Sequence, residues 1–262
     1  MIIPLSTSRR KALAQLRHRR HRHEQELFMI EGTKSVADTL GLFDCVAVIA
    51  TAAWLGVNSG LINPGTEILQ ARNEDMRAIS SLSTPPEVIA VCRIPRRTLD
   101  PAVLHDGLTV ALDGVQDPGN LGTIVRTCDW FGIRRLICSP DCVDIYNSKA
   151  IQATMGALAR VEVYYADLPR LLSQFPAEMI FGTFLDGDNI YSASLPPSGI
   201  IVMGNEGNGI SPALRQHIGR HLYIPPGNPA AAHVESLNVS IATAIVLSQF
   251  QYHTLNNGKT KQ

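Results

Sequence analysis

The stretch Ile200-Ile201-Val202-Met203-Gly204-Asn205-Glu206-Gly207-Asn208-Gly209-Ile210-Ser211-Pro212 decides the fold. Its four leading apolar residues predict a strand buried on both faces, as in a parallel sheet covered by helices. The three glycines that follow predict a turn that uses positive φ or approaches a ligand closely. Because ligands of such sheets bind beyond the carboxyl ends of the strands, this turn is a candidate site.

Strands and helices alternate on both sides of this stretch, which predicts an α/β domain with a parallel sheet. Strands are expected at residues 108–112, 136–138, 161–165, 179–184, 200–203 and 222–224. Helices are expected near residues 118–130, 148–158, 168–175, 212–218 and 236–252.

The first ninety-odd residues show a shorter alternation of the same kind and predict a small α/β domain. Strands are expected at residues 27–30, 46–49 and 88–94, and helices at 8–23, 36–40 and 73–82. Two prolines and two arginines then break the pattern at Pro95-Arg96-Arg97-Thr98-Leu99-Asp100-Pro101. We therefore expect a basic arm and small domain at 1–95, a linker at 96–106 and a second domain at 107–262.

The net charge of zero, from 23 basic and 23 acidic side chains, hides an asymmetry. The basic arm, residues 1–23, carries seven cations and no carboxylate, whereas the remainder has 16 basic and 23 acidic groups. The cations are Arg9, Arg10, Lys11, Arg17, Arg19, Arg20 and Arg22. Such an arm fits a polyanion, RNA first, and these are the candidate RNA-binding residues. A solvated helix face explains the charge run equally well.

Composition argues against a membrane protein, a secreted protein and a metal-binding protein. The longest nearly apolar run, 45–57, is shorter than the ~20 residues of a membrane span, and the N-terminus lacks the pattern of a signal peptide. Five cysteines include no CxxC pair, which favours free thiols in a reducing cytosol and no bound metal. His18, His21 and His23 lie within the basic arm and are expected to extend its positive face.

The first loop, residues 113–127, begins a helix in a recognisable way. Asp117 suits the N-cap and Pro118 the first helical position. A buried stripe is expected at Leu121, Ile124, Val125 and Cys128. At about 100° per residue Arg126 points away from that stripe. Taken alone, Arg126 is an ordinary surface arginine and Asn120 a second local cap.

The second loop, residues 200–212, matches neither GxGxxG nor GxxxxGK[ST], so neither a dinucleotide fingerprint nor a P-loop is present. Glu206 on this constrained turn is placed to face a cationic ligand. The third loop, residues 222–240, is rich in proline and opens a long apolar helix, for which Ser236 or Asn238 is the expected N-cap.

Taken in this order, the three loops resemble the three motifs of the SpoU/TrmH RNA ribose methyltransferases. The matching stretches are Asp117-Pro118-Gly119-Asn120-Leu121-Gly122 with Arg126-Thr127, Gly204-Asn205-Glu206-Gly207-Asn208-Gly209-Ile210-Ser211, and Ile224-Pro225 with Ser236-Leu237-Asn238-Val239-Ser240. The resemblance spans roughly residues 107–254. Phe28-Met29-Ile30-Glu31-Gly32 resembles the opening of the family's substrate-binding domain, while the loop at 225–235 is longer than is typical.

The resemblance implies transfer of a methyl group from S-adenosylmethionine to a ribose 2′-hydroxyl, by a homodimer whose parallel sheet carries a trefoil knot. It assigns catalysis to Arg126 with Asn120, and places Glu206, Ser236 and Asn238 around substrate and cofactor. It assigns the cofactor to Met203, Gly204, Glu206, Ile224 and Leu237, with Thr183 a weaker candidate. Because arginine does not release its proton in proteins, we expect Arg126 to hold an RNA phosphate and orient the hydroxyl. That phosphate or a water then receives the proton.

Three alternatives stay open. The separate N-terminal domain favours ribosomal RNA by analogy, and tRNA is the alternative substrate. An inactive SpoU-like protein that binds RNA or the ribosome is a second possibility. A Rossmann-type enzyme for a small molecule is a third, disfavoured by the missing fingerprint and by the basic arm.

Overall fold

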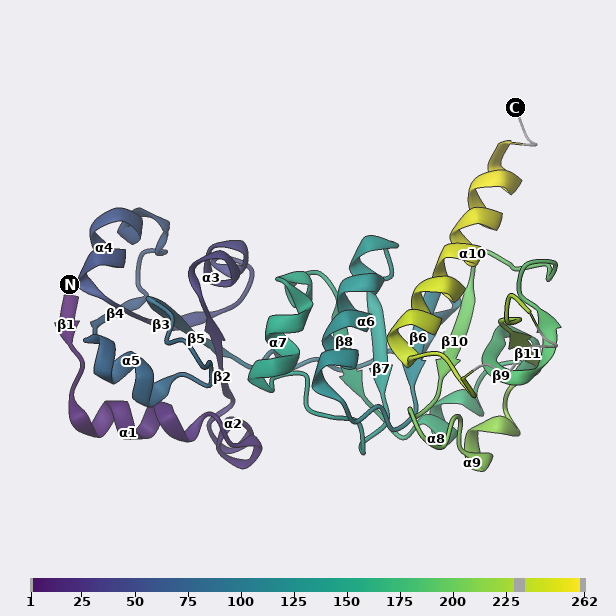
Figure 1. The fold of residues 1–262 in the computed structure, drawn as a ribbon, viewed down its shortest axis with the longest axis horizontal. Coiled ribbons are helices and arrows are strands. Elements are labelled where there is room, and N and C mark those ends of the chain that lie inside the picture. Colours follow the sequence, from purple (N-terminus) through teal and green to yellow (C-terminus); the bar gives the residue numbers. More distant parts are fainter. Residues whose placement is uncertain (1, 229–233, 260–262) are drawn as a thin grey trace. The chain divides into compact units, whose positions relative to one another are not determined.

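The computed structural model describes residues 2–228 and 234–259 (Figure 1). The chain forms two compact units, each with its own sheet. Unit 1 comprises Met1–Arg96 and Asp144–Ala159, and unit 2 comprises Arg97–Val143 and Arg160–Gln262. None of the described helices is long and apolar enough to cross a membrane.

Unit 1 is built on a mixed sheet of five strands in the order β1-β4-β3-β5-β2. The strands are β1 (Ile2–Pro4), β2 (Leu27–Glu31), β3 (Cys45–Ala50), β4 (Glu67–Gln70) and β5 (Val88–Arg93). β5 runs antiparallel to both of its neighbours, and the other pairs are parallel. The predicted strands are confirmed as β2, β3 and β5, whereas the short β1 and β4 were not predicted.

The α-helices of unit 1 that precede Arg96 are α1 (Thr7–Gln15), α2 (Arg19–Gln25), α3 (Thr33–Thr39), α4 (Ala52–Asn58) and α5 (Asn73–Ile79). The single helix expected from Ser8 to about His23 is therefore wrong, because the chain turns at Leu16 to bury that side chain in the core. Ser6 caps α1, and its Oγ accepts the Arg9 N–H at 3.3 Å.

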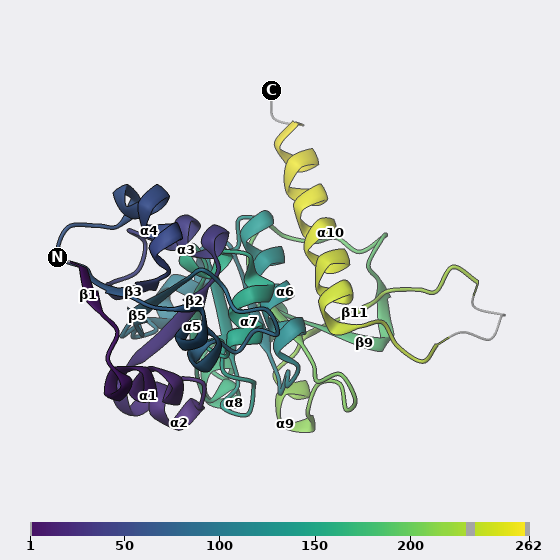
Figure 2. The ribbon, with the colours of Figure 1, turned by 60° about the vertical axis from the view of Figure 1, so that its left-hand side comes forward.

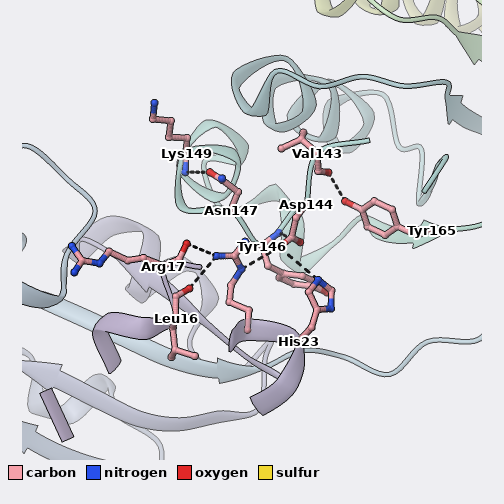
Figure 3. A network of polar contacts seen from close by, with 10 residues as sticks. Leu16, Arg17, His23, Val143, Asp144, Tyr146, Asn147, Lys149 and Tyr165 are labelled. Carbon is pink, nitrogen blue, oxygen red and sulfur yellow. Dashed lines mark hydrogen bonds and ion pairs between the residues drawn. The ribbon is translucent and has the colours of Figure 1, made fainter. Parts of the chain in front are cut away.

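The segment Asp144–Ala159, which contains α7 (Ser148–Thr154), packs with unit 1 although it follows a strand of unit 2 in sequence. A buried ion pair holds it there, since two nitrogens of Arg22 donate to Asp144 Oδ2 at 2.6 and 3.1 Å. Figure 3 shows Asp144 in one polar network with Leu16, Arg17 and His23. Arg22 Nη1 donates to the carbonyls of Leu16 and Arg17 at 3.0 and 2.8 Å. Both charges are thereby satisfied away from water.

Unit 2 is built on a fully parallel sheet in the order β11-β9-β10-β6-β7-β8, which confirms the predicted fold class. The strands are β6 (Leu108–Leu112), β7 (Arg135–Cys138), β8 (Glu162–Tyr165), β9 (Ile180–Asn189), β10 (Gly199–Met203) and β11 (Arg220–Tyr223). Every predicted strand is present. β9 extends beyond its predicted end, and β11 shifts register against it after His221.

Helices cover both faces of this sheet. α8 (Leu168–Leu172) and α9 (Pro212–Arg215) pack on the face that carries Ile180 and Ile200. α6 (Pro118–Trp130) and α10 (Val239–Lys259) lie side by side in Figures 1 and 2. The rings of Phe250 in α10 and Phe181 in β9 pack edge to face, with their centroids 5.1 Å apart. Phe181 lies on the opposite face of the sheet from Ile180. Helices thus cover both faces of the sheet. The first and second loops leave it at the carboxyl ends of β6 and β10.

Candidate functional site

The site starts where β6 and β10 end. These strands pair in register up to Leu112 and Met203, so the first and second loops leave the sheet together. The Asp113 N–H donates to the Met203 carbonyl at 2.9 Å, and Asp113 Oδ2 accepts the Ser211 N–H at 2.6 Å. The first loop therefore fixes both ends of the glycine turn.

Close packing of the main chain explains the glycines of the second loop. A Cβ on Gly204 would lie 2.2 Å from the carbonyl carbon of Gly209, closer than any real contact, and Gly209 has φ +67°. Asn205 and Gly209 exchange two main-chain hydrogen bonds of 2.9 Å. The turn therefore presents Glu206 from a rigid support.

Asn205, which the sequence reasoning missed, holds this turn against the first loop. Its Oδ1 accepts the N–H groups of Gly207 and Asn208 at 2.9 and 3.0 Å, and its Nδ2 donates to the Gly114 carbonyl at 2.7 Å. An asparagine followed by a glycine-rich turn is the local signal for such a bond. The long-range bond to Gly114 has no sequence signal.

A chain of three polar side chains joins all three loops. Asn120 Nδ2 donates to Glu206 Oε1 at 3.0 Å, and Asn238 Nδ2 donates to Asn120 Oδ1 at 2.9 Å. The Asp117 N–H also approaches Glu206 Oε1, at 3.4 Å. Residues separated by up to 118 positions thus meet beyond the ends of β6 and β10. The structure brings together Asn120, Glu206 and Asn238, as the candidate site requires.

Asn238, not Ser236, is the N-cap of α10, which begins at Val239. Asn238 Oδ1 accepts the N–H groups of Ser240 and Ile241 at 2.9 and 3.3 Å, and also the Ser240 hydroxyl at 2.6 Å. Ser236 is exposed, and its side chain has no polar partner among the described residues. Asn238 therefore serves two purposes, because its oxygen caps a helix while its nitrogen enters the polar chain.

Arg126 lies on the exposed side of α6, as predicted. Asp117 caps the helix through the Asn120 N–H at 2.8 Å. The stripe of Leu121, Ile124, Val125 and Cys128 is fully buried. Across residues 2–228 and 234–259, the Arg126 guanidinium makes no hydrogen bond and no ion pair. It is a free cation on a rigid helix, six residues and nearly two turns beyond Asn120.

Three of the residues assigned to the cofactor, Met203, Gly204 and Ile224, lie at or directly after the carboxyl ends of β10 and β11. Met203 ends β10 and is buried, and its sulfur lies 3.8 Å from the hydroxyl of half-buried Thr183. Ile224 directly follows β11, and the Leu237 side chain is 46% exposed. In the described part of the chain, the N–H groups of Ile224 and Leu237 have no acceptor, so both can donate to a ligand. Part of the long loop, 229–233, lies outside the described residues.

The basic arm differs from its prediction. Arg22 is buried against Asp144, so the assignment of this residue to RNA is wrong. Three more cations face carboxylates, in the pairs Arg9–Glu67, Arg10–Asp75 and Arg20–Glu24. Three are exposed with no carboxylate partner among the described residues, namely Lys11, Arg17 and Arg19.

The described histidines, cysteines and carboxylates do not form a metal site. Within 2–228 and 234–259 no three His, Cys, Asp or Glu residues gather closely enough to hold a metal ion. All five cysteines are free thiols. His23 instead approaches Asp144 at 3.8 Å, and His21 approaches Glu24 at 3.5 Å.

Comparisons with known proteins identify the family of both parts of the chain. Residues 107–248 match the SpoU rRNA Methylase family, and residues 8–90 match the MRM3-like substrate binding domain. The chain is 30% identical over 236 residues to the 23S rRNA (guanosine(2553)-2′-O)-methyltransferase RlmP of Bacillus subtilis, covering 88% of this chain and 91% of that protein.

Solved structures give the same result. A TrmH-family protein from Porphyromonas gingivalis is 39% identical with a TM-score of 0.83, covering 94% of this chain and 98% of its own. An AdoMet-bound rRNA methyltransferase from Sinorhizobium meliloti is 26% identical with a TM-score of 0.81, covering 97% and 98%.

Proposed function

This chain belongs to the SpoU rRNA methylase family, and we propose that it transfers a methyl group from S-adenosylmethionine to a ribose 2′-hydroxyl of ribosomal RNA. The observation that carries the proposal is the polar chain Glu206–Asn120–Asn238, which joins all three loops. Its member Asn120 lies on the same helix as the free Arg126, six residues before it. The names of the Bacillus and Sinorhizobium relatives support the substrate and the methyl donor.

S-adenosylmethionine, when bound, supplies a methyl group carried on a sulfonium cation. The main chain at Gly204, Ile224 and Leu237 is assigned to hold it, and the free N–H groups at the latter two positions fit that task. The Glu206 carboxylate, fixed by Asn120, adds negative charge near a cationic ligand. Met203 ends β10, and Thr183 of the neighbouring strand β9 contacts its sulfur.

Arg126 is assigned to the RNA. A guanidinium grips a phosphate through two parallel hydrogen bonds, and this one has no competing protein partner among the described residues. Held in this way, the ribose hydroxyl is oriented for attack, and its proton passes to the phosphate or to a water. Asn120, Ser236 and Asn238 complete the surroundings of the hydroxyl.

The proposal includes a cytoplasmic homodimer that uses α10, and the trefoil knot of the family. The exposed apolar side chains of Ile241, Tyr252 and Leu255 on α10 support the dimer. Sedimentation equilibrium at micromolar concentration tests it, and a species of 28.5 kDa would contradict it.

The activity is tested with labelled S-adenosylmethionine and three acceptors: 23S rRNA from a strain that lacks this gene, bulk tRNA and small nucleosides. We expect label in rRNA alone, recovered as a 2′-O-methylated nucleoside after digestion. Label in tRNA would contradict the assignment to ribosomal RNA and identify tRNA as a substrate. Donor binding without transfer to any RNA would favour the inactive RNA-binding alternative.

A further inference from the structure

We propose that Trp130 is a stacking platform for an RNA base beside the nucleotide that is methylated. The inference rests on the proposed function, since it takes RNA to be held by Arg126. It adds a substrate-binding residue that contacts a base, whereas Arg126 contacts the backbone.

The position of Trp130 on α6 carries the inference. Trp130 follows Arg126 by four residues, so the two side chains are neighbours on one helix face, about 5–6 Å apart at Cβ. The ring is 85% exposed, although this residue is among those that gain most from burial. It belongs neither to the buried stripe of α6 nor to any ring pair in the described part of the chain.

The second tryptophan shows the usual behaviour of this residue. Trp54 in unit 1 is 2% exposed, and its Nε1 donates to Thr33 Oγ1 at 3.0 Å. Its apolar body and its polar group are therefore both satisfied. Trp130 has a full aromatic face in water, which a planar ligand would cover.

Charge favours RNA as that ligand. Asp129 is the one carboxylate in the sequence of α6, and Arg160 neutralises it with nitrogen–oxygen distances of 2.6 to 3.1 Å. The exposed face of the helix therefore offers a free cation and a ring without an unpaired negative charge. A strand whose phosphate lies on Arg126 can place an adjoining base on Trp130.

Stacking sets the expected size of the effect. A base on an aromatic side chain contributes enough affinity that its loss weakens RNA binding about tenfold. Every base has a flat face, so the contact tolerates different sequences. Because the ring touches no reacting atom, we expect its loss to change KM for RNA and not kcat.

Three variants separate stacking from other uses of an apolar surface. Trp130→Phe keeps a ring, Trp130→Leu keeps apolar bulk without one, and Trp130→Ala removes both. We expect about a tenfold rise in KM for 23S rRNA in the Leu and Ala variants, unchanged kcat and donor affinity, and largely restored KM in the Phe variant. A Leu variant equal to wild type would overturn the stacking role.

Acrylamide quenching tests the contact without catalysis, so it separates failure of this inference from failure of the proposed function. Emission of wild type minus that of Trp130→Phe reports the Trp130 ring, because the buried Trp54 is common to both. We expect 23S rRNA to protect the ring, even should wild type fail to transfer methyl. Unchanged quenching with RNA would overturn the proposal. Protection that grows with protein concentration alone would assign the ring to contact between copies of the chain.

Discussion

Arg22 in the basic arm and Arg126 on α6 show two opposite uses of the same side chain. Arg22 is 3% exposed, satisfied by Asp144 and two carbonyls, and links Asp144–Ala159 to the rest of unit 1. Arg126 is exposed and has no polar partner in the described residues. The difference teaches that a count of cations along the chain does not measure the charge available to RNA. What decides it is whether folding brings an acceptor to each cation.

The strongest test of this comparison is the loss of Arg22. Arg22→Ala leaves Asp144 charged and buried, and we expect unit 1 to lose about 3–5 kcal/mol of unfolding free energy. Urea unfolding followed by Trp54 emission, in a Trp130→Phe background, measures it. Arg20→Ala is the matched control, because the Arg20–Glu24 pair is exposed and its loss costs less than about 1 kcal/mol. Equal effects of the two variants would show that the buried pair has no special role.

Arg126 is expected to have the complementary phenotype. Arg126→Ala opens no core cavity, so stability should change by less than about 1 kcal/mol, while methyl transfer falls by about 10²–10³. Arg126→Lys should recover little, since an ammonium lacks the bidentate fork. Single-turnover methylation at saturating RNA is measured beside donor titration on the same protein. Lost donor binding would make Arg126 a cofactor or structural residue.

The arm itself should show both classes of cation. If Lys11, Arg17 and Arg19 reach phosphates, changing all three to Gln should flatten the log–log salt dependence of single-stranded RNA binding by about 2 units. The same change at Arg9, Arg10 and Arg20, which face carboxylates, should flatten it much less. Equal flattening would mean that RNA displaces these ion pairs.

Glu31 provides the smallest test, as a buried carboxyl that forms no ion pair among the described residues and is affected by the Arg17 charge only weakly. Burial raises the pKa of the Glu31 carboxyl, and the hydrogen bonds from Ser80 and Ser81 only partly oppose this. The native state therefore holds this proton more tightly than the unfolded chain. The stability that this bound proton contributes is fully present below the ordinary glutamate pKa of about 4.3. It is lost as the pH rises through the higher pKa that Glu31 has in the native state.

Glu31→Gln keeps an acceptor for Ser80 and Ser81 but removes the titration. As the pH rises through that window, the unfolding free energy of the Gln variant should therefore increase relative to wild type, by at most about 1.4 kcal/mol per pH unit. Urea unfolding of both proteins at several pH values measures it. A constant difference across the window would mean that the native and unfolded states share one pKa at Glu31.

Local signals explain most of what the sequence predicted. The Asp117 cap, the buried stripe of α6 and the position of β10 depend on neighbours in sequence, and all three are confirmed. The family resemblance is confirmed as well. The assignment of individual roles to Arg126 and the cofactor residues stays a prediction.

Long-range contacts explain what the sequence did not show. The Arg22–Asp144 pair joins residues 122 positions apart, and no periodicity indicates it. The choice of Asn238 over Ser236 as the cap depends on where α10 meets Asn120, which only the folded chain decides. The exposure of Trp130 also depends on the folded chain. The helical pattern predicts that the ring points away from the core, but it does not predict whether another part of the chain covers the ring.

The most direct test of the proposed activity is a ribose-methylation map of ribosomal RNA from a deletion strain. The strain is complemented in parallel with wild type, Arg126→Ala, or the arm control Arg20→Ala. We expect one or more 2′-O-methyl marks to be lost on deletion, restored by wild type and Arg20→Ala, and not restored by Arg126→Ala at equal protein level. An identical map with and without the gene would contradict the proposed function, and full restoration by Arg126→Ala would contradict the role of that cation.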